Sequence, residues 1–365
     1  MKKINKEITS SKPVRVGISI GDINGIGPEV IMKSLNDNRL LFDFTPVIYG
    51  SSKVFSFYKK RISIKEFVLH SCSSIDDIKP RKVNIINLWD GELKFDLGKP
   101  TFNSGKLAFE SLEAATSDLA KGKIDVLVTS PISKDAMNQF GFKFPGHTEY
   151  LADMSGQEDA LMLMVESDLR VGLVSSHIPL KEVSQKLTAD KIQNKIKSFS
   201  KTLITDFGIL RPKIAVLGLN PHSGESGKIG SEELDIIIPS IEKVKEEGII
   251  AMGPFPADGF FGSNIWKNYD GILAMYHDQG LAPFKAISFH EGVNFTAGLP
   301  IVRTSPDHGT AYDIVGQDKA SGNSMRNAIY TAIDVFRNRQ LNKEINSNKL
   351  QKQELQVDKK NKKAK

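Results

Sequence analysis

Residues 270–316 read DGILAMYHDQGLAPFKAISFHEGVNFTAGLPIVRTSPDHGTAYDIVG and hold polar residues at a density that no fold requires. The apolar run Gly271–Tyr276 has the composition of a strand, and His277 and Asp278 follow it directly. Open α/β sheets bind their ligands at the carboxyl ends of strands, so this run predicts a site at a sheet edge. We expect the stretch to hold an anion, because three more polar side chains follow near glycines or prolines: Lys285, Asn294 and Arg303.

The rest of the chain alternates apolar, β-rich runs with helical patterns, which indicates βα units and a mostly parallel sheet. Amphipathic helices are expected at residues 102–121 and at residues 323–339, the second of which would close the fold. No internal repeat or long linker is visible, so two α/β domains are expected to be intertwined rather than arranged in series. The expected strands are residues 14–20, 46–49, 83–88, 124–129, 170–175, 213–219 and 271–276.

Length and composition limit the number of domains and the class of protein. With 365 residues and 40% hydrophobic content, the chain can bury a large core, and its length suggests two domains. No apolar run approaches the roughly 20 residues of a membrane helix, and no signal-peptide core follows the first lysines, so we expect a cytoplasmic protein without membrane partners. Cys72 is the only cysteine, which excludes an intrachain disulfide and a cysteine-based metal site.

The net charge of +6 lies in the two ends of the chain. Residues 341–365 contain eight lysines and three acids, and residues 1–12 contain four lysines and one acid, so the remaining body is close to −2. A basic face for nucleic acid is therefore not expected. Residues 341–365 form a lysine-rich tail of low apolar content, which we expect to be disordered or a frayed helix.

The first expected strand runs into GDINGIGPE, residues 21–29, which has some features of a dinucleotide-binding turn. Its glycines follow a strand and Pro28 suits the first turn of a helix, but the spacing is not GxGxxG. Two interpretations stay open, a tight strand-to-helix turn and a direct contact with ligand.

Three of the seven histidines share one context, an apolar strand that runs into a loop: His177, His222 and His277. Because parallel strands end at one edge, the three imidazoles could converge there, and three neutral imidazoles with an open position can hold a catalytic zinc-like ion. The alternative for each histidine alone is a structural role. Nearby acids could orient the imidazoles or act as bases, namely Glu225, Asp258 and Asp278, although Asp258 could also be an ordinary turn residue.

Seven motifs, spread over roughly residues 14–336, resemble the 4-hydroxythreonine-4-phosphate dehydrogenase family. They are GIGPE at Gly25, GHTEYLA at Gly146, HIPL at His177, NPHSGESGKIGSEE at Asn220, GPFPADGFF at Gly253, YHDQGLAPFK at Tyr276 and GVNFTAGLPIVRTSPDHGTAYDIVG at Gly292. The chain departs from the family pattern at Ile23 and Asn24, where the family usually has proline and a small residue. The tail beyond Leu341 is unmatched.

The resemblance implies the fold of isopropylmalate and isocitrate dehydrogenases. That fold has two intertwined α/β/α domains with a cleft between them and is not a Rossmann domain. Residues 13–130 plus 290–340 are expected to form the first domain, with the NAD loop. Residues 131–289 are expected to form the second, with the metal-binding histidines and a dimer interface.

The resemblance also implies a site shared between the two subunits of a homodimer. It assigns a divalent metal, with zinc expected first and cobalt, magnesium or nickel as alternatives, to His177, His222 and His277. It assigns the phosphorylated substrate to His147, Thr148, Lys285, Asn294 and Arg303. Residues 307–316 resemble the loop that holds the adenosine half of the cofactor, NAD or NADP, which points to His308, Gly309, Thr310 and Asp313.

The implied chemistry is an oxidation followed by decarboxylation. A divalent metal makes the alkoxide of a secondary alcohol accessible near neutral pH, hydride passes to NAD, and the resulting β-keto acid loses CO2. Asp258, Asp278 and Lys285 are the candidates for proton transfer, in an open order. For Arg303 the alternative to anion binding is a salt bridge with Asp307 or Asp313.

Two other functions remain open. A relative could oxidise threonate or erythronate 4-phosphate in the same way, because the choice depends on whether the pocket recognises an amino group or a hydroxyl. A metal hydrolase would also need only a three-histidine ion with bound water, although the resemblance of residues 307–316 to a cofactor loop argues against it.

Overall fold

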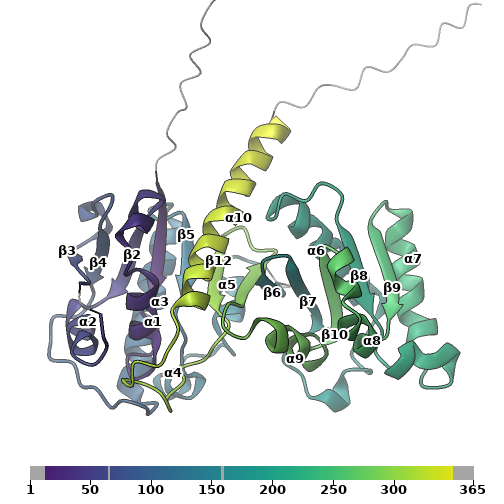
Figure 1. Ribbon diagram of the computed structural model, residues 1–365, viewed down its shortest axis with the longest axis horizontal. Coiled ribbons are helices and arrows are strands. Elements are labelled where there is room, and N and C mark those ends of the chain that lie inside the picture. Colours follow the sequence, from purple (N-terminus) through teal and green to yellow (C-terminus); the bar gives the residue numbers. More distant parts are fainter. Residues whose placement is uncertain (1–12, 65, 158–159, 348–365) are drawn as a thin grey trace, which may run out of the picture.

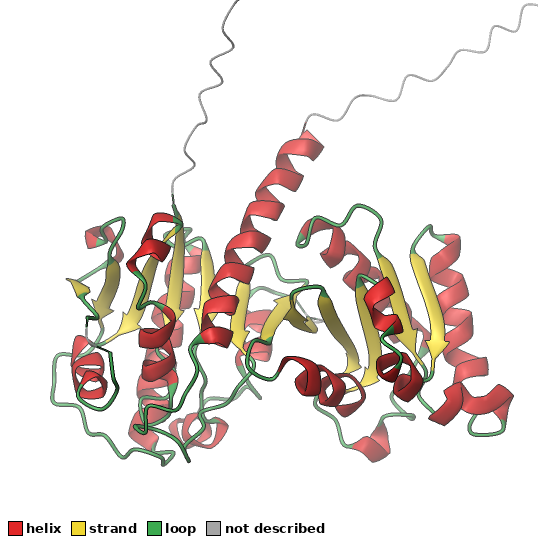
Figure 2. Cartoon of the chain, viewed as in Figure 1, coloured by secondary structure: helices red, strands yellow, loops and turns green. Residues whose placement is uncertain are grey.

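The computed structural model describes residues 13–64, 66–157 and 160–347, and it contains one twelve-stranded sheet. The strand order is β3-β4-β2-β1-β5-β12-β11-β6-β7-β10-β8-β9 (Figure 1). This order differs from the 3-2-1-4-5-6 order of a Rossmann domain. Helices lie on both faces of the strand row (Figure 2). No helix in the described ranges combines the length and the apolar character needed to cross a bilayer.

The first half of the sheet is parallel throughout. Its strands are β1 (Val14–Ser19), β2 (Phe44–Gly50), β3 (Leu69–Cys72), β4 (Val83–Asn87), β5 (Val126–Thr129) and β12 (Arg303–Pro306). The helices that belong to it are α1 (Gly27–Ser34), α2 (Ser52–Lys59), α3 (Phe102–Ala120), α4 (Lys134–Phe140) and α10 (Asn323–Ser347).

The second half is mixed where it joins the first. β11 (Val293–Ala297) is antiparallel to both β12 and β6 (Leu161–Glu166), and β6 is antiparallel to β7 (Leu169–Ser175). The outer strands continue parallel to β7: β10 (Gly271–Tyr276), β8 (Lys213–Leu217) and β9 (Ile250–Phe255). The helices are α5 (His147–Met154), α6 (Ala189–Thr205), α7 (Ile238–Glu246), α8 (Ala257–Gly262) and α9 (His277–Ser288).

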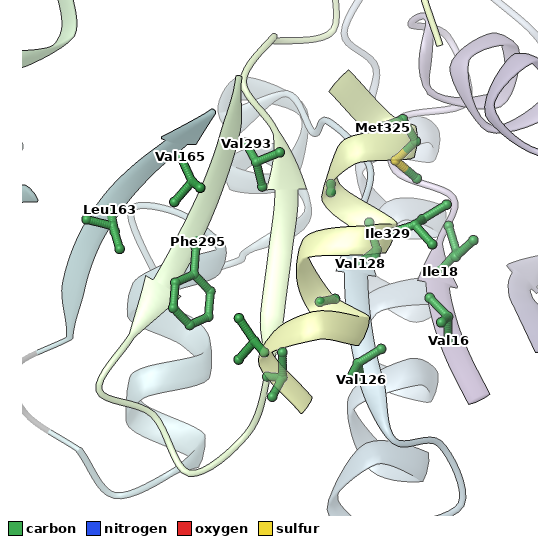
Figure 3. Close-up of a cluster of buried hydrophobic side chains, with 14 of the residues drawn as sticks. Val16, Ile18, Val126, Val128, Leu163, Val165, Val293, Phe295, Met325 and Ile329 are labelled. Carbon is green, nitrogen blue, oxygen red and sulfur yellow. The ribbon is translucent and has the colours of Figure 1, made fainter. Parts of the chain in front are cut away.

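Side-chain alternation along the strands explains the layers. In β5, Val126 and Val128 belong to the same core cluster as the buried face of α10, whereas Leu127 belongs to the cluster that contains α3. Figure 3 shows Met325 and Ile329 of α10 close to these valines. β8 alternates in the same way between the α6–α7 layer and the α8–α9 layer. Each half is therefore an α/β/α sandwich.

The chain enters the second half after α4 and returns through β11 to β12 and α10. The prediction of two intertwined α/β/α units is therefore confirmed, and α10, the yellow helix in Figure 1, packs across the junction. All seven expected strands and both expected helices are present, with ends shifted by a few residues. Residues 341–347, expected in a tail that is disordered or a frayed helix, continue α10 to Ser347. Residues 348–365 lie outside the described residues.

Candidate active site

Arg303 is a buried cation without a carboxylate partner in the part of the chain that the structure describes. Its side chain lines a cavity of about 240 Å³, here called the Arg303 cavity, and only 2% of the residue is exposed. Nε and Nη2 donate to Thr129 Oγ1 at 3.0 and 2.6 Å, and Nη1 donates to Thr296 Oγ1 at 3.1 Å. Burial lowers the pKa of Arg303 to about 10. The surroundings of Arg303 disfavour its positive charge, so this position suits an anionic ligand.

Four other polar atoms in the wall of this cavity are buried and have no hydrogen-bond partner among the described residues. They are Ser130 Oγ, His147 Nε2, Asn294 Oδ1 and His308 Nε2. Burial and the charge of Arg303 hold the pKa of His147 well below its ordinary value, and burial lowers that of His308. Native proteins leave few buried polar atoms unpaired, so a cluster of them at one cavity indicates a place for a polar ligand.

The cavity collects most of the predicted substrate residues. His147, Thr148, Asn294 and Arg303 all line it. Lys285 lies on α9 and joins the cavity through Asp307, which accepts from Lys285 Nζ at 3.0 Å. Asp307 is thereby paired with Lys285 and not with Arg303, so the alternative of an Arg303 salt bridge with Asp307 is wrong.

Two of the predicted metal ligands lie together. The ring centroids of His177 and His277 are 6.0 Å apart, which two imidazoles on one ion can accommodate. His277 opens α9 and its Nδ1 lies 2.7 Å from Asp278 Oδ1. His177 Nδ1 lies 3.5 Å from Glu149 Oε1. The nitrogen that remains for a metal on each ring is therefore Nε2.

His222 lies in a different cavity of about 500 Å³, which Asp258, Tyr276 and Gln279 also line. After β8 the chain forms a left-handed turn in which six consecutive residues, 222–227, have positive φ. Such a turn costs roughly 1–2 kcal/mol for each residue that is not glycine. Glu233 holds the preceding residues: its Oε1 accepts from the backbone of Leu219 and of Asn220, each at 2.7 Å.

The three imidazoles therefore do not converge within one chain. Across residues 13–64, 66–157 and 160–347, no group of three or more histidines, cysteines and acids could hold a metal ion. The three strands that precede these histidines are adjacent, in the order β7-β10-β8, but the left-handed turn carries His222 into the second cavity. The expectation of convergence from sheet topology alone is wrong. A three-histidine metal site stays a prediction that needs a ligand from a second chain.

The predicted cofactor residues divide into two groups. His308 and Gly309 line the Arg303 cavity, whereas Thr310 and Asp313 lie further along the loop. The Thr310 carbonyl accepts from the Ile26 backbone at 3.0 Å, and Asp313 is exposed. Lys33 on α1 fixes the far end of the loop by an ion pair of 2.9 Å with Asp318.

The glycine loop at residues 21–29 packs against this cofactor loop. A Cβ on Gly25 would lie 2.9 Å from the Thr310 carbonyl, so the close approach of the two backbones requires glycine. Asp22 accepts from Tyr312 Oη at 2.7 Å and is fully buried. The structural interpretation of this motif, a tight turn, agrees with these contacts.

Three functional candidates were missed in the sequence. Glu149 and Lys134 line the Arg303 cavity, and Gln279 links the ends of β10 and β8 by accepting from Met275 and donating to the Gly218 carbonyl. Glu149 lies inside the GHTEYLA motif beside His147 and Thr148, so that motif could have indicated it. Lys134 and Gln279 carry no comparable signal.

Comparison with known proteins gives one consistent family. Residues 43–332 match the family of the pyridoxal phosphate biosynthetic protein PdxA. The chain is 48% identical over 342 residues to 4-hydroxythreonine-4-phosphate dehydrogenase of Bacteroides thetaiotaomicron, with 93% of each chain covered. It is 38% identical to a Cutibacterium acnes protein named "Putative D-threonate 4-phosphate dehydrogenase", covering 88% of this chain and 94% of that one.

A solved structure agrees with the sequence relatives. The crystal structure of 4-hydroxythreonine-4-phosphate dehydrogenase from Klebsiella pneumoniae superposes with a TM-score of 0.78 at 33% identity, covering 90% of this chain and 99% of that chain. The fold, the motifs and these matches extend over nearly the whole chain. The chain therefore belongs to the PdxA family of pyridoxal phosphate biosynthetic proteins.

Proposed function

We propose that this chain oxidises 4-phosphohydroxy-L-threonine with NAD, or NADP, to a 2-amino-3-keto acid phosphate. Decarboxylation then gives 3-amino-2-oxopropyl phosphate, a step towards pyridoxine 5'-phosphate. Relatives named 4-hydroxythreonine-4-phosphate dehydrogenase at 48% and 40% identity support this substrate. The observation that carries the proposal is the Arg303 cavity, because a buried guanidinium without a carboxylate partner among the described residues suits a phosphorylated or carboxylated substrate.

The cavity walls supply the contacts that such a substrate needs. Arg303 has N–H groups beyond those given to the two threonines, and it can bind an oxyanion by its planar fork. His147 Nε2 and Asn294 lie beside it with unpaired polar atoms. Lys285, held by Asp307, adds a second cation at the rim. In this proposal these residues fix the substrate, with Thr148 contributing its hydroxyl.

The donor set fits a borderline divalent ion such as zinc. His177 and His277 would hold it together with His222, and a carboxylate faces Nδ1 of each of the first two rings. Such an ion supplies Lewis acidity, which lowers the pKa of a substrate hydroxyl. NAD supplies the hydride acceptor, and His308 and Gly309 are the cofactor residues nearest to the substrate cavity.

Proton transfer is assigned to Asp258, Asp278 and Lys285. Asp278 is occupied by its contact with His277 Nδ1, and Asp258 shares the cavity of His222. Lys285 is connected to the Arg303 cavity through Asp307, which makes it the candidate that the geometry of a single chain favours. In this proposal Asp307 holds the Lys285 ammonium in place while a proton moves at Nζ.

We propose a homodimer with shared sites. His222 lies apart from the other two histidines, so a three-histidine site requires a second chain.

A second candidate is the oxidation of D-threonate 4-phosphate. Two relatives with that name are 38% and 37% identical to this chain. Both substrates carry a phosphate and a carboxylate, which suit the Arg303 cavity. They differ in one group, because 4-phosphohydroxy-L-threonine has an amino group where threonate 4-phosphate has a hydroxyl.

The test measures reduced-nicotinamide absorbance with purified protein, NAD and zinc. 4-Phosphohydroxy-L-threonine, threonate 4-phosphate and erythronate 4-phosphate are compared at equal concentration. We expect a preference for the amino acid, expressed in kcat/KM, that a chelator abolishes. A preference for the sugar acids would favour the second candidate. Turnover of none, together with hydrolysis of a phosphate ester, would overturn the dehydrogenase proposal.

A further inference from the structure

Glu149 is an acid inside a cavity that suits anions. It is the third residue of α5, its side chain is 35% exposed, and it lines the Arg303 cavity. Its carboxylate lies 3.5 Å from His177 Nδ1. A carboxylate at this place repels a phosphate or a carboxylate ligand, so anion binding does not explain it.

Asp307 is the other acid in the wall of the Arg303 cavity, and it has a cationic partner, whereas Glu149 has none among the described residues. Asp307 is paired with Lys285 at 3.0 Å. Glu149 interacts with the charges of Lys134 and Arg303 only at longer range, and its side-chain partner among the described residues is the imidazole of His177. The contact with His177 is therefore the direct side-chain interaction of Glu149.

The neighbouring histidine has the same arrangement. Asp278 Oδ1 lies 2.7 Å from His277 Nδ1, and the two rings are 6.0 Å apart. Each imidazole thus turns Nδ1 towards a carboxylate that comes from a helix: Glu149 from α5 and Asp278 from α9. A carboxylate on Nδ1 keeps the proton on that nitrogen, fixes the ring orientation and raises the basicity of Nε2.

We infer that Glu149 is the positioning residue of His177, holding its ring in the Nδ1–H tautomer with Nε2 presented to a divalent cation. The inference rests on the proposed metal dependence of the function. In this inference Glu149, a residue of α5, controls the orientation of the metal ligand His177 in the loop after β7. Glu149 thereby links the substrate cavity to the cation, because His147 and Thr148 precede it on the same helix.

The experiment compares Glu149→Ala and Glu149→Gln with wild type in zinc affinity, measured by competition with a chromophoric chelator. We expect zinc binding by Glu149→Ala to weaken by about 10- to 100-fold. Glu149→Gln should lose less, because its amide oxygen still accepts from Nδ1–H. At saturating zinc, kcat of both variants should return close to the wild-type value, which a merely structural defect would not allow. Asp153→Ala, one turn further along α5 and exposed, is the matched control.

A second readout needs no metal. Nitrogen-15 NMR of labelled histidine in the zinc-free protein should show His177 as the Nδ1–H tautomer in wild type and as a mixture in Glu149→Ala. Unchanged zinc affinity and an unchanged tautomer in Glu149→Ala would overturn the inference, and so would a loss of kcat that saturating zinc does not restore. Wild-type protein that binds no zinc, while the tautomer still changes, would remove the metal proposal and keep Glu149 as the residue that orients His177.

Discussion

At Arg303 a full positive charge is held by two threonine hydroxyls in place of a carboxylate. Removing a guanidinium from water without a counter-ion is unfavourable, and the lowered pKa of about 10 expresses that cost. Arg339 shows the opposite arrangement, since it forms a bidentate pair with the buried Asp206, with contacts of 2.8 and 3.0 Å. The two arginines thus differ in their partners: Arg339 has a buried carboxylate, whereas Arg303 is the residue proposed to bind the anionic substrate.

Arg303→Met should weaken substrate binding strongly while leaving the fold intact. Loss of a charge-assisted contact, worth about 1.5–3 kcal/mol, corresponds to roughly a 10- to 100-fold rise in KM. Without ligand, the free energy of unfolding should change by no more than about 1 kcal/mol, because an uncompensated buried charge has been removed. Steady-state kinetics measures KM, and denaturant titration with and without inorganic phosphate measures the free energy of unfolding and the stabilisation by an anion.

Arg339→Met is the matched control for this measurement. It leaves Asp206 buried and unpaired and should cost about 3–5 kcal/mol of stability, with the phosphate effect retained. An equal loss of stability in the two variants would show that Arg303 is also a structural residue.

Among the elements, the left-handed turn that carries His222 departs most from regular geometry. Four of its six residues are not glycine, so neighbouring contacts must stabilise it. Glu233 provides them from the following helical segment, because its buried carboxylate accepts from two backbone N–H groups and from Asn220 Nδ2. The sequence NPHSGESGKIGSEE thus contains both the strained turn and the residue that fixes it.

Glu233→Leu should loosen this turn. The backbone N–H groups of Leu219 and Asn220 lose their acceptor, and each buried unpaired group costs about 1–3 kcal/mol. Hydrogen exchange measured by mass spectrometry should show faster exchange in residues 219–227 than in β7 or β10. Glu232→Leu removes only a side-chain contact with Asn220 and serves as the control. Equal protection of the turn in wild type and Glu233→Leu would contradict this account.

The sequence predicted seven of the twelve strands and missed β3, β6, β9, β11 and β12, and for β12 and β9 the reason is physical. β12 consists of RTSP, because Arg303, Ser305 and Pro306 line the cavity, so the strand lacks an apolar pattern. β9 contains Gly253 and Pro254 and lies at the edge of the sheet, where such residues are tolerated. His277 was placed correctly because it follows its strand directly. His222 was not placed correctly, because it lies five residues after Leu217, the end of β8, and a segment of this length can turn in several ways.

At the scale of the molecule, the two halves meet at β11 and β12, and the Arg303 cavity lies at that junction. The cavity takes Thr129 from the end of β5, His177 from the loop after β7, and Arg303 from β12. Substrate and cation would therefore be held by both halves, which suits a cleft between two units.

Subunit complementation tests the shared site. His177→Ala and His222→Ala should each be inactive, and refolding the two together should restore about a quarter of wild-type activity. That yield follows because half of the dimers are mixed and one of their two sites keeps both histidines. A variant with both substitutions, refolded with either one, should recover nothing. Mixed dimers that form without recovering activity would show that each site takes these histidines from one chain.

The position of β12 also affects how the protein can be made. β12 pairs with β5 in the first half, yet about 170 residues separate Thr129 from Arg303 along the chain. During synthesis the first half emerges early, with β5 as an unprotected edge and without the helix α10 that covers Val126 and Val128. β5 can pair with β12 only after almost the whole polypeptide has left the ribosome. The nascent chain is therefore most exposed to aggregation while the second half is being translated.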